Sequence, residues 1–320
     1  MIYLGIDTSN YTTSVAAYDS SSKTVIQFKR LLPVKKGERG LRQSDAVFHH
    51  TQQFPELITK LTETVESDFS AVGVSVKPRL VDGSYMPCFT VGITNAVSIS
   101  SVLRVPMYEF SHQQGHIIAA LYSADKMELI REPFVAFHVS GGTTEVLYVT
   151  PDKENVINCE IIASSTDLKA GQAIDRVGVM MGLDFPCGMQ LDKLATQSGK
   201  EYKIKTSVKD GNCSLSGLEN KCKAMFDKGE AYEDIAKFCI DYISATLEEM
   251  TLNILEKYGK LPLVFSGGVM SNSIINKRFT DKFGAYFATS EFSSDNAAGI
   301  AILASIKGGD NEYCFDCKSD

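Results

Sequence analysis

The sequence lacks any apolar run that approaches the roughly 18 consecutive residues of a membrane-spanning helix. It opens directly on the strand-like residues 1–6, with neither a basic leader nor a cleavage site. A regular cysteine framework is also missing, because the eight cysteines are scattered apart from Cys314 and Cys317. A single C-x-x-C pair is a weak zinc motif, so we interpret residues 308–320 as a flexible tail. These absences exclude a membrane-spanning protein and predict a cytoplasmic one with reduced thiols.

The sequence has no excess of positive charge. The formal net charge is −7 and the isoelectric point is about 5.4, so the overall charge does not indicate nucleic-acid binding. One local exception is a loop-like basic run that only Glu38 interrupts. It consists of Lys29, Arg30, Lys35, Lys36, Arg39 and Arg42. Such a run is usually a solvated surface, and the alternative is contact with an anionic partner such as RNA.

Histidine is scarce, and two of the five histidines lie four residues apart in the stretch 111–116. Ser111 and Gln114 form a capping-box pattern, so we predict that a helix begins here. His112 and His116 then lie one turn apart on the same face of that helix. Two imidazoles at this spacing can share one metal ion. The alternative is a pair of polar first-turn side chains that bond to loop backbone.

Two segments of the chain follow the same plan. Residues 2–18 read as an apolar strand, a small polar turn at 7–10 and a second strand, and residues 134–149 repeat this around the turn 140–144. Backbone N–H groups and hydroxyls at such turns suit a phosphate or a carboxylate. An ordinary hairpin turn is the alternative for each segment. The duplication favours two homologous lobes that face each other across a central cleft.

Helical and strand patterns alternate along the rest of the chain, as in α/β proteins. A helical pattern covers 45–65, and we expect Pro55 to break or kink this helix. A strand pattern at 70–76 and a helical pattern near 91–102 follow. The strongest amphipathic helix covers 231–257 and ends before Gly259.

Two later segments carry further candidate site residues. A strand pattern at 261–265 opens into Gly267 and Gly268, where a nucleotide can approach the backbone at a helix N-terminus. Tight packing of strand on helix explains these glycines equally well. Asp295 precedes a helix of small residues. It is either a helix N-cap or the carboxylate that joins His112 and His116 in a site of two histidines and one carboxylate.

Taken together, these residues resemble the universal tRNA threonylcarbamoyladenosine transferase family, formerly described as O-sialoglycoprotein endopeptidases. The resemblance spans nearly the whole chain, from residue 2 to about residue 306, and depends on the order of its motifs. Besides the histidine pair, the motifs are Leu4-Gly5-Ile6-Asp7-Thr8-Ser9, Val139-Ser140-Gly141-Gly142, Ala170-Gly171-Gln172-Ala173-Ile174-Asp175-Arg176-Val177, Ser214-Leu215-Ser216-Gly217-Leu218, Ser266-Gly267-Gly268-Val269 with Asn272, and Ser294-Asp295-Asn296-Ala297-Ala298.

The resemblance implies an actin-like ATPase fold with two homologous lobes. The first lobe would cover 1–110, with a helix at 295–307 packing back on it, and the second would cover 111–294. The resemblance also implies that His112, His116 and Asp295 hold one divalent metal ion, iron or zinc. The positions implied for ATP or threonylcarbamoyl adenylate are Ser140, Gly141, Gly142, Asp175, Gly188, Asp192, Gly267, Gly268 and Asn272.

The implied activity is transfer of the threonylcarbamoyl group from its adenylate to the exocyclic amine of an adenine in tRNA. The attacking amine belongs to the RNA, so no serine or cysteine nucleophile is required and the catalytic residues remain unassigned. The metal would polarise a carbonyl or phosphate oxygen, and backbone donors of the 140–142 turn would stabilise negative charge. The implied partners are tRNA, bound through the basic run, a shorter paralogue and a small ATPase.

Three departures from the family pattern indicate a diverged paralogue. Tyr11 and Thr12 stand where an acidic pair is usual, Thr143 stands where a histidine is usual, and residues 77–83 replace a Gly-Pro-Gly-rich turn. They leave open a non-catalytic subunit that binds nucleotide and metal. A metalloprotease is the third hypothesis and the least favoured, because 112–116 lacks the glutamate that serves as general base in H-E-x-x-H.

Overall fold

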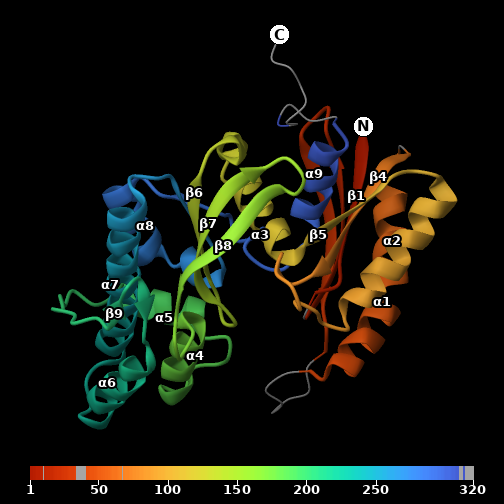
Figure 1. The fold of residues 1–320 in the computed structure, drawn as a ribbon. Helices are drawn as coiled ribbons and strands as arrows, with labels where there is room; N and C mark the ends of the chain where they lie inside the picture. Colours follow the sequence, from red (N-terminus) through yellow and green to blue (C-terminus); the bar gives the residue numbers. More distant parts are fainter. Residues whose placement is uncertain (10, 34–40, 67, 310–312, 314–320) are drawn as a thin grey trace. The chain divides into compact units, whose positions relative to one another are not determined.

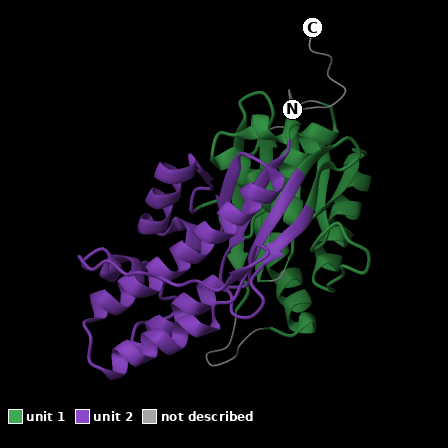
Figure 2. Cartoon of the chain, turned by 60° about the vertical axis from the view of Figure 1, so that its left-hand side comes forward, with its two compact units in different colours: residues 1–132, 150–159, 291–320 green, residues 133–149, 160–290 purple. Residues whose placement is uncertain are grey.

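The computed structural model describes residues 1–9, 11–33, 41–66, 68–309 and 313 (Figure 1). They form two compact units, which Figure 2 distinguishes by colour. Unit 1 comprises Met1–Glu132, Thr150–Cys159 and Glu291–Asp320, and unit 2 comprises Pro133–Val149 and Glu160–Ser290. Each unit contains a five-stranded sheet. Within the described ranges, none of the helices combines the length and the apolar character needed to cross a membrane.

The sheet of unit 1 has the strand order β3-β2-β1-β4-β5. Its strands are β1 (Ile2–Asp7), β2 (Thr12–Asp19), β3 (Thr24–Leu31), β4 (Phe69–Lys77) and β5 (Met107–Ser111). Strands β1, β2 and β3 pair antiparallel, whereas β1, β4 and β5 run parallel. The strand–turn–strand plan predicted for 2–18 is confirmed as the β1–β2 hairpin, although residue 10 of its turn lies outside the described residues.

Helices cover both faces of this sheet. They are α1 (Gln43–Thr64), α2 (Phe89–Leu103), α3 (His112–Ser123), the 3-10 helix η1 (Met127–Arg131) and α9 (Ala298–Lys307). Helix α9 lies directly on one face, since a Cβ added to Gly5 would be 2.6 Å from the backbone nitrogen of Ala301. Helix α2 covers the other face, where Gly92 lies against Ile6. Neighbouring residues of β1 therefore face different helices, as strand alternation requires.

Helix α1 continues through Pro55, so the break predicted at this proline does not occur. An interior proline costs roughly 3 kcal/mol, since it removes a backbone donor. Phe54, Leu57 and Leu61 of α1 are buried in the core of unit 1. Each buried side chain of this size contributes about 1.5–3 kcal/mol, so their packing outweighs the proline.

The sheet of unit 2 has the strand order β12-β11-β6-β7-β8. Its strands are β6 (Phe134–Val139), β7 (Thr144–Asp152), β8 (Val156–Ser164), β11 (Leu263–Ser266) and β12 (Tyr286–Phe287). Strand β6 pairs antiparallel with β7 and parallel with β11, which is parallel to β12. This is the strand order of unit 1, with β6 in the place of β1. The duplication predicted from the two hairpins is therefore confirmed in the topology of the sheets.

The helices of unit 2 pack around the long helix α7. The remaining elements are α4 (Ala170–Met180), α5 (Gly188–Ala195), the hairpin β9 (Val208–Lys209) and β10 (Asn212–Cys213), α6 (Ser216–Asp227), α7 (Tyr232–Tyr258), the 3-10 helix η2 (Gly268–Ser271) and α8 (Ser273–Phe283). The amphipathic helix predicted at 231–257 is confirmed as α7, which packs against α5, α6 and α8. In the core, the Phe265 ring stacks on Phe137 at 4.5 Å and meets Phe279 edge-on at 5.0 Å.

The division between the units differs from the one expected at residue 110. Residues 111–132 belong to unit 1, because α3 packs against α9. The helix expected at 295–307 begins at Ala298 and packs on β1 and β4. Most of the segment 308–320, including Cys314 and Cys317, lies outside the described residues.

Candidate functional site

The start of α3 is fixed by the capping box that the sequence predicted. The Ser111 hydroxyl accepts a hydrogen bond from the Gln114 backbone (3.2 Å), and the Gln114 side chain accepts one from the Ser111 backbone (2.8 Å). The Gln114 amide group also donates to the carbonyls of Asn155 (2.7 Å) and Ile157 (3.0 Å). These bonds hold the start of α3, whose first and second turns carry His112 and His116, in one orientation.

Two glycines bring α3 and α9 into close contact. A Cβ on Gly299 would collide with the carbonyl oxygen of Gly115, and a Cβ on Gly115 would be 2.8 Å from the side chain of Ile300. Gly299 therefore requires glycine for packing, whereas a side chain at position 115 would require the Ile300 side chain to shift. The close approach places His116 beside Asp295, which precedes α9 by three residues.

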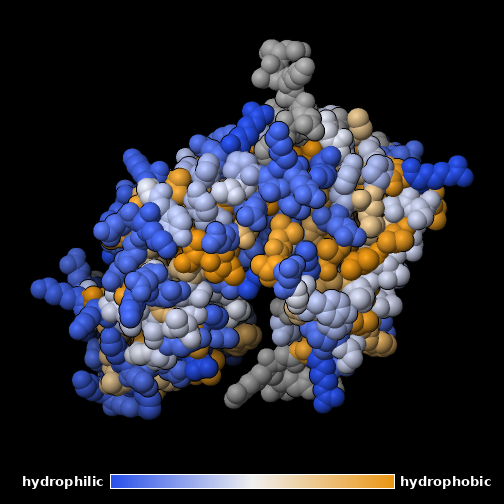
Figure 3. Space-filling model, in the orientation of Figure 1, coloured by the Kyte–Doolittle hydropathy of each residue, from blue (hydrophilic) through white to orange (hydrophobic). Residues whose placement is uncertain are grey.

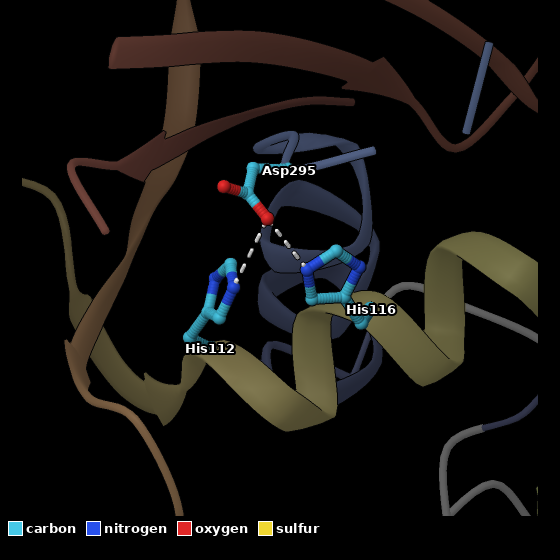
Figure 4. Close-up of side chains that lie close together, drawn as sticks. All are labelled: His112, His116 and Asp295. Carbon is cyan, nitrogen blue, oxygen red and sulfur yellow. Dashed lines mark hydrogen bonds and ion pairs between the residues drawn. The ribbon is translucent and has the colours of Figure 1, made fainter. Parts of the chain in front are cut away.

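His112, His116 and Asp295 come together in unit 1 (Figure 4). One carboxylate oxygen of Asp295, Oδ1, lies 3.0 Å from Nε2 of His116 and 3.5 Å from Nε2 of His112. The imidazole rings are 4.3 Å apart and nearly perpendicular. One ligand atom from each residue lies within 4.8 Å of the others, so the three groups can surround a single ion. The side chains are 18%, 6% and 25% exposed, respectively, so His116 is buried while His112 and Asp295 keep partial access to solvent.

A fourth side chain, Asp7, orients His112. Asp7 Oδ2 lies 2.7 Å from Nδ1 of His112. The other oxygen, Oδ1, accepts hydrogen bonds from the Ser75 hydroxyl and the Ser9 backbone, both at 2.8 Å. In the neutral form of His112, a proton held on Nδ1 by this carboxylate would leave Nε2 as the lone-pair atom that faces Asp295. No role was predicted for Asp7 from its pattern, although its place at the end of the first strand was a usable signal.

The charges of the cluster are strongly coupled. Burial on its own would lower the pKa of His112, but the carboxylates of Asp7 and Asp295 outweigh burial and raise the pKa to about 10. Burial also favours the neutral form of both carboxyls, yet the histidines hold the pKa of Asp295 well below its usual range. His112 likewise lowers the pKa of Asp7. Both carboxylates are therefore charged at neutral pH, which favours a cation between them.

The N-cap alternative for Asp295 does not hold in this structure. The N-cap of α9 is Ala297, and the backbone N–H of Ala298 is bonded instead by the side chain of Asn296 (3.1 Å). The carboxylate of Asp295 is directed to the two histidines (Figure 4).

The basic run is partly strand rather than loop. Lys29 and Arg30 lie on β3. The Arg30 guanidinium donates two hydrogen bonds to the Glu56 carboxylate (2.6 and 2.7 Å), and the Lys29 ammonium donates to the Glu291 carbonyl and the Ser294 hydroxyl. Arg42 is the N-cap residue of α1. Lys35, Lys36 and Arg39 lie outside the described residues.

In unit 2, the turn 140–142 and the Gly267–Gly268 step lie next to each other. They follow β6 and β11, which are parallel neighbours and so end at the same edge of the sheet. The Ser140 hydroxyl accepts hydrogen bonds from the backbones of Gly142 (3.3 Å) and Thr143 (3.1 Å), which closes the turn. Gly267 has a φ of +97°, and a Cβ there would collide with the carbonyl oxygen of Val139.

The candidate nucleotide-binding glycines of unit 2 fall into two groups. Gly267 is required by its own backbone conformation and by packing. Gly141, Gly142, Gly188 and Gly268 have ordinary φ values, and a Cβ on any of them would meet nothing within 4 Å. The fold gives no reason for glycine at the second group. Bare backbone that faces open space is what close approach of a ligand requires.

The four remaining candidate nucleotide residues form two neighbouring pairs in unit 2. Asp175 of α4 accepts a hydrogen bond from the backbone of Cys187, the N-cap residue of α5, which begins with Gly188 (2.9 Å). Burial raises the pKa of Asp175. Asp192 of α5 accepts from the side chain of Asn272 (2.9 Å), whose own oxygen caps α8. The structure therefore brings Asp175 near Gly188, and Asp192 to Asn272.

The backbones of Thr12 and Thr143, two positions expected from the sequence to depart from the family pattern, form local hydrogen bonds. Thr12 is buried at the start of β2, and its backbone N–H donates to the Ser9 carbonyl (3.3 Å). Thr143 closes the 140–142 turn through its backbone, since its carbonyl accepts from the Ser140 N–H (2.7 Å).

Comparison with known proteins agrees with this architecture. Residues 34–302 match the family model described as tRNA N6-adenosine threonylcarbamoyltransferase. The protein of that name from Buchnera aphidicola is 28% identical over 324 residues, covering 96% of this chain and 93% of its own. The one from Thermotoga neapolitana is 27% identical over 314 residues, covering 94% and 92%.

Solved structures with an actin-like ATPase fold share the arrangement of the chain. Full-length HypF in its phosphate- and nucleotide-bound form superimposes with a TM-score of 0.60 at 14% identity, over 96% of this chain and 55% of HypF. Component A of (R)-2-hydroxyglutaryl-CoA dehydratase from Acidaminococcus fermentans gives a TM-score of 0.55 at 15% identity, over 97% and 99%. The actin-like fold expected from the sequence is confirmed.

Proposed function

This chain belongs to the tRNA N6-adenosine threonylcarbamoyltransferase family, and on this basis we propose that it transfers a threonylcarbamoyl group from its adenylate to an adenine amine of tRNA. The observation that carries the proposal is the convergence of His112, His116 and Asp295 from segments 179 residues apart. We further propose that these three residues hold one divalent metal ion, iron or zinc.

The donor set fits such an ion. Two imidazole nitrogens and one carboxylate oxygen suit iron and zinc alike. The Asp7 carboxylate on the far nitrogen of His112 is the outer-shell partner that metal-binding histidines usually have. When bound, the ion would supply Lewis-acid polarisation of a carbonyl or phosphate oxygen.

The edge of unit 2 would hold the adenylate or ATP. The backbone at Gly141, Gly142 and Gly268 faces open space, so a phosphate can approach it closely. Each oxygen of Asp192 already accepts a bond from Asn272 or Ser273, but a carboxylate has about four lone-pair sites and can accept a ribose hydroxyl as well. Asp175 and Gly188 are proposed as further contacts to the nucleoside.

The transfer itself requires no nucleophile from the protein. The exocyclic nitrogen of the adenine forms a bond to the carbamoyl carbon, the bond from that carbon to the phosphate oxygen breaks, and AMP leaves while the amine loses one proton. Backbone donors of the 140–142 turn would stabilise negative charge that develops on oxygen. This assigns positioning and charge stabilisation, rather than covalent catalysis, to the chain.

The partners belong to the same proposal. We assign the proposed tRNA contact to Lys35, Lys36, Arg39 and Arg42, because Lys29 and Arg30 are engaged within the protein. Family analogy adds a shorter paralogue and a small ATPase.

The test is transfer from threonylcarbamoyl adenylate to unmodified tRNA by purified protein, read by mass spectrometry of the digested nucleosides. The wild-type protein should form modified adenosine, and His116→Ala should abolish it. His49→Ala is the matched control, since His49 lies outside the cluster. Product formed equally by His116→Ala would refute the proposed site.

A second candidate is a non-catalytic subunit that binds nucleotide and metal. The residue types at Thr12 and Thr143 motivate it, because a threonine hydroxyl supplies neither the carboxylate nor the imidazole expected there from the family resemblance. This candidate predicts binding of ADP and metal without transfer, even when the partners are supplied. A protease is not supported, because Gln113 stands in place of the general base and glutamine cannot accept a proton.

A further inference from the structure

Asp295 lies in a segment that no regular element holds. Helix α9 begins only at Ala298, and its first turn is bonded to the Ala297 carbonyl (3.0 Å, from the Ala301 N–H) and to the Asn296 side chain (3.1 Å, from the Ala298 N–H), whereas Asp295 precedes these bonds. A metal ligand needs a defined position, because a displacement of about 1 Å is enough to weaken a site. The Asn296 side chain holds the segment from within, by donating to the carbonyls of Phe292 (3.2 Å) and Ser294 (2.7 Å), and contacts with the sheet hold it from outside.

Two strands hold the segment. The backbone N–H of Ala297 donates to the Ser14 hydroxyl of β2 (2.9 Å). The Lys29 ammonium of β3 donates to the Glu291 carbonyl (2.7 Å) and to the Ser294 hydroxyl (2.9 Å). Ser14 and Lys29 are directly opposite each other in the β2–β3 ladder, so they lie on the same face.

Strand alternation separates Lys29 from its neighbour. Arg30 and its cross-strand partner Thr13 contact α1 through Glu56 and His50. Lys29 lies on the other face, together with Gln27, whose side chain donates to the Glu291 carboxylate (3.0 Å). The alternation gives Lys29 and Arg30 different roles although they are adjacent in sequence.

We propose that Lys29 is a positioning residue for the metal centre. By bonding to both Glu291 and Ser294, Lys29 fixes the position of Asp295. The proposal rests on the assignment of Asp295 as a metal ligand. The ammonium is half-buried, and its bonds to the segment compensate for the water that it loses.

The direction in which metal affinity changes when Lys29 is replaced distinguishes a positioning role from a purely electrostatic one. Removing a positive charge near a cation site strengthens cation binding by Coulomb's law. Removing the group that orders Asp295 weakens cation binding, because the segment must then be ordered when the ion binds. Only the positioning role predicts weaker binding.

The experiment titrates the complete chain of the wild type and of Lys29→Met with Co²⁺. Calorimetry measures the affinity, and the visible spectrum of the bound ion reports its coordination. Methionine keeps the length of the side chain and removes its donors. We expect the affinity to fall by about tenfold or more, the usual effect of losing an outer-shell partner. Lys29→Arg, which keeps the charge and the donors, should restore most of the affinity and the spectrum. Arg30→Met, on the opposite face, should bind as the wild type does.

A second measurement does not depend on the metal. Hydrogen exchange of the Ala297 amide in metal-free protein should be faster in Lys29→Met and unchanged in Arg30→Met. Equal or tighter Co²⁺ binding by Lys29→Met, or unchanged exchange at Ala297, would overturn the positioning role. If the wild type itself bound no Co²⁺, the metal assignment would fail, and the exchange data would still decide whether Lys29 orders the segment. Should Lys29→Met not fold, Lys29→Gln would replace it in both measurements.

Discussion

At the scale of single residues, the properties of the candidate centre follow from how two carboxylates share the histidine nitrogens. The Asp7 carboxylate is hydrogen-bonded to Nδ1 of His112, and the Asp295 carboxylate faces Nε2 of both histidines. The Asp7 carboxylate holds the His112 ring in place, and the Asp295 carboxylate would complete the proposed donor set. The same arrangement raises the pKa of His112 to about 10, so at neutral pH a metal ion competes with a proton for this site.

This competition makes metal affinity depend on pH. An imidazole binds metal only when it is neutral, and the pKa of His112 lies above the neutral range. Affinity for Co²⁺ should therefore rise by about tenfold per pH unit from about pH 6 to about pH 8, as one proton is displaced. Asp7→Asn removes one of the charges that raise this pKa, so its affinity should be less dependent on pH. Calorimetric titrations at several pH values measure both slopes, and a flat wild-type profile would contradict the assignment of His112.

At the scale of the element, glycines decide which segments meet. Gly115 and Gly299 allow α3 and α9 to touch, which is what brings the histidines to Asp295. Gly267 allows the end of β11 to pack on β6, whereas Gly268 faces open space. The sequence does not distinguish these glycines, but the structure shows that Gly267 and Gly299 are needed for packing, whereas Gly268 has space around it for a ligand.

Gly299→Ala should destabilise the protein. The added Cβ would collide with the carbonyl of Gly115, and such overpacking costs about 1–3 kcal/mol or more. Chemical denaturation measures the free energy of unfolding. Gly199→Ala is the control, since this exposed glycine has open space around it, and its effect should stay within about 0.5 kcal/mol. Equal stability of the two variants would show that the helix contact tolerates a side chain.

The two adjacent glycines at the end of β11 should respond differently to alanine. Gly268→Ala should keep the stability of the wild type and weaken binding of ADP, because its Cβ would point into the space proposed for the nucleotide. Gly267→Ala should lower stability, because of its positive φ and its contact with Val139. Calorimetry with ADP and thermal unfolding separate the two effects. Unchanged ADP affinity of Gly268→Ala would place the nucleotide elsewhere.

At the scale of the whole molecule, one duplicated architecture carries two kinds of site. In unit 1 the candidate metal centre uses Asp7, the last residue of β1, together with the first turn of α3 after β5. In unit 2 the turn 140–142 follows β6, which occupies the place of β1. Both candidate sites thus lie at the carboxyl end of the equivalent central strand, where parallel neighbours also end.

Metal binding should raise the melting temperature, because the ion joins α3 to the segment before α9, which is far away in sequence. A ligand at one hundred times its dissociation constant stabilises the folded state by about 2.7 kcal/mol. Thermal unfolding with and without Co²⁺ measures the rise in melting temperature. This rise should be absent in Asp295→Asn and present in His49→Ala. A rise that persists in Asp295→Asn would mean that the ion binds elsewhere.

Local patterns alone were sufficient for much of this protein. Hydrophobic periodicity and turn composition determined the two hairpins, the long helix α7 and the capped start of α3, because these depend on neighbours within a few residues. The spacing of His112 and His116 also fixed their common helix face. Pro55 is an exception, since burial of one face of α1 outweighs the tendency of proline to interrupt a helix.

Only the tertiary structure decided which distant residues meet. Asp295 joins His116 across 179 positions and Asp7 joins His112 across 105, through contacts between strands and helices that no local pattern encodes. The basic run showed the same limit, because strand alternation turned Lys29 toward the segment before α9 and Arg30 toward α1. A sequence lists which groups are available, but packing determines their distances, and the chemistry of a site depends on distances.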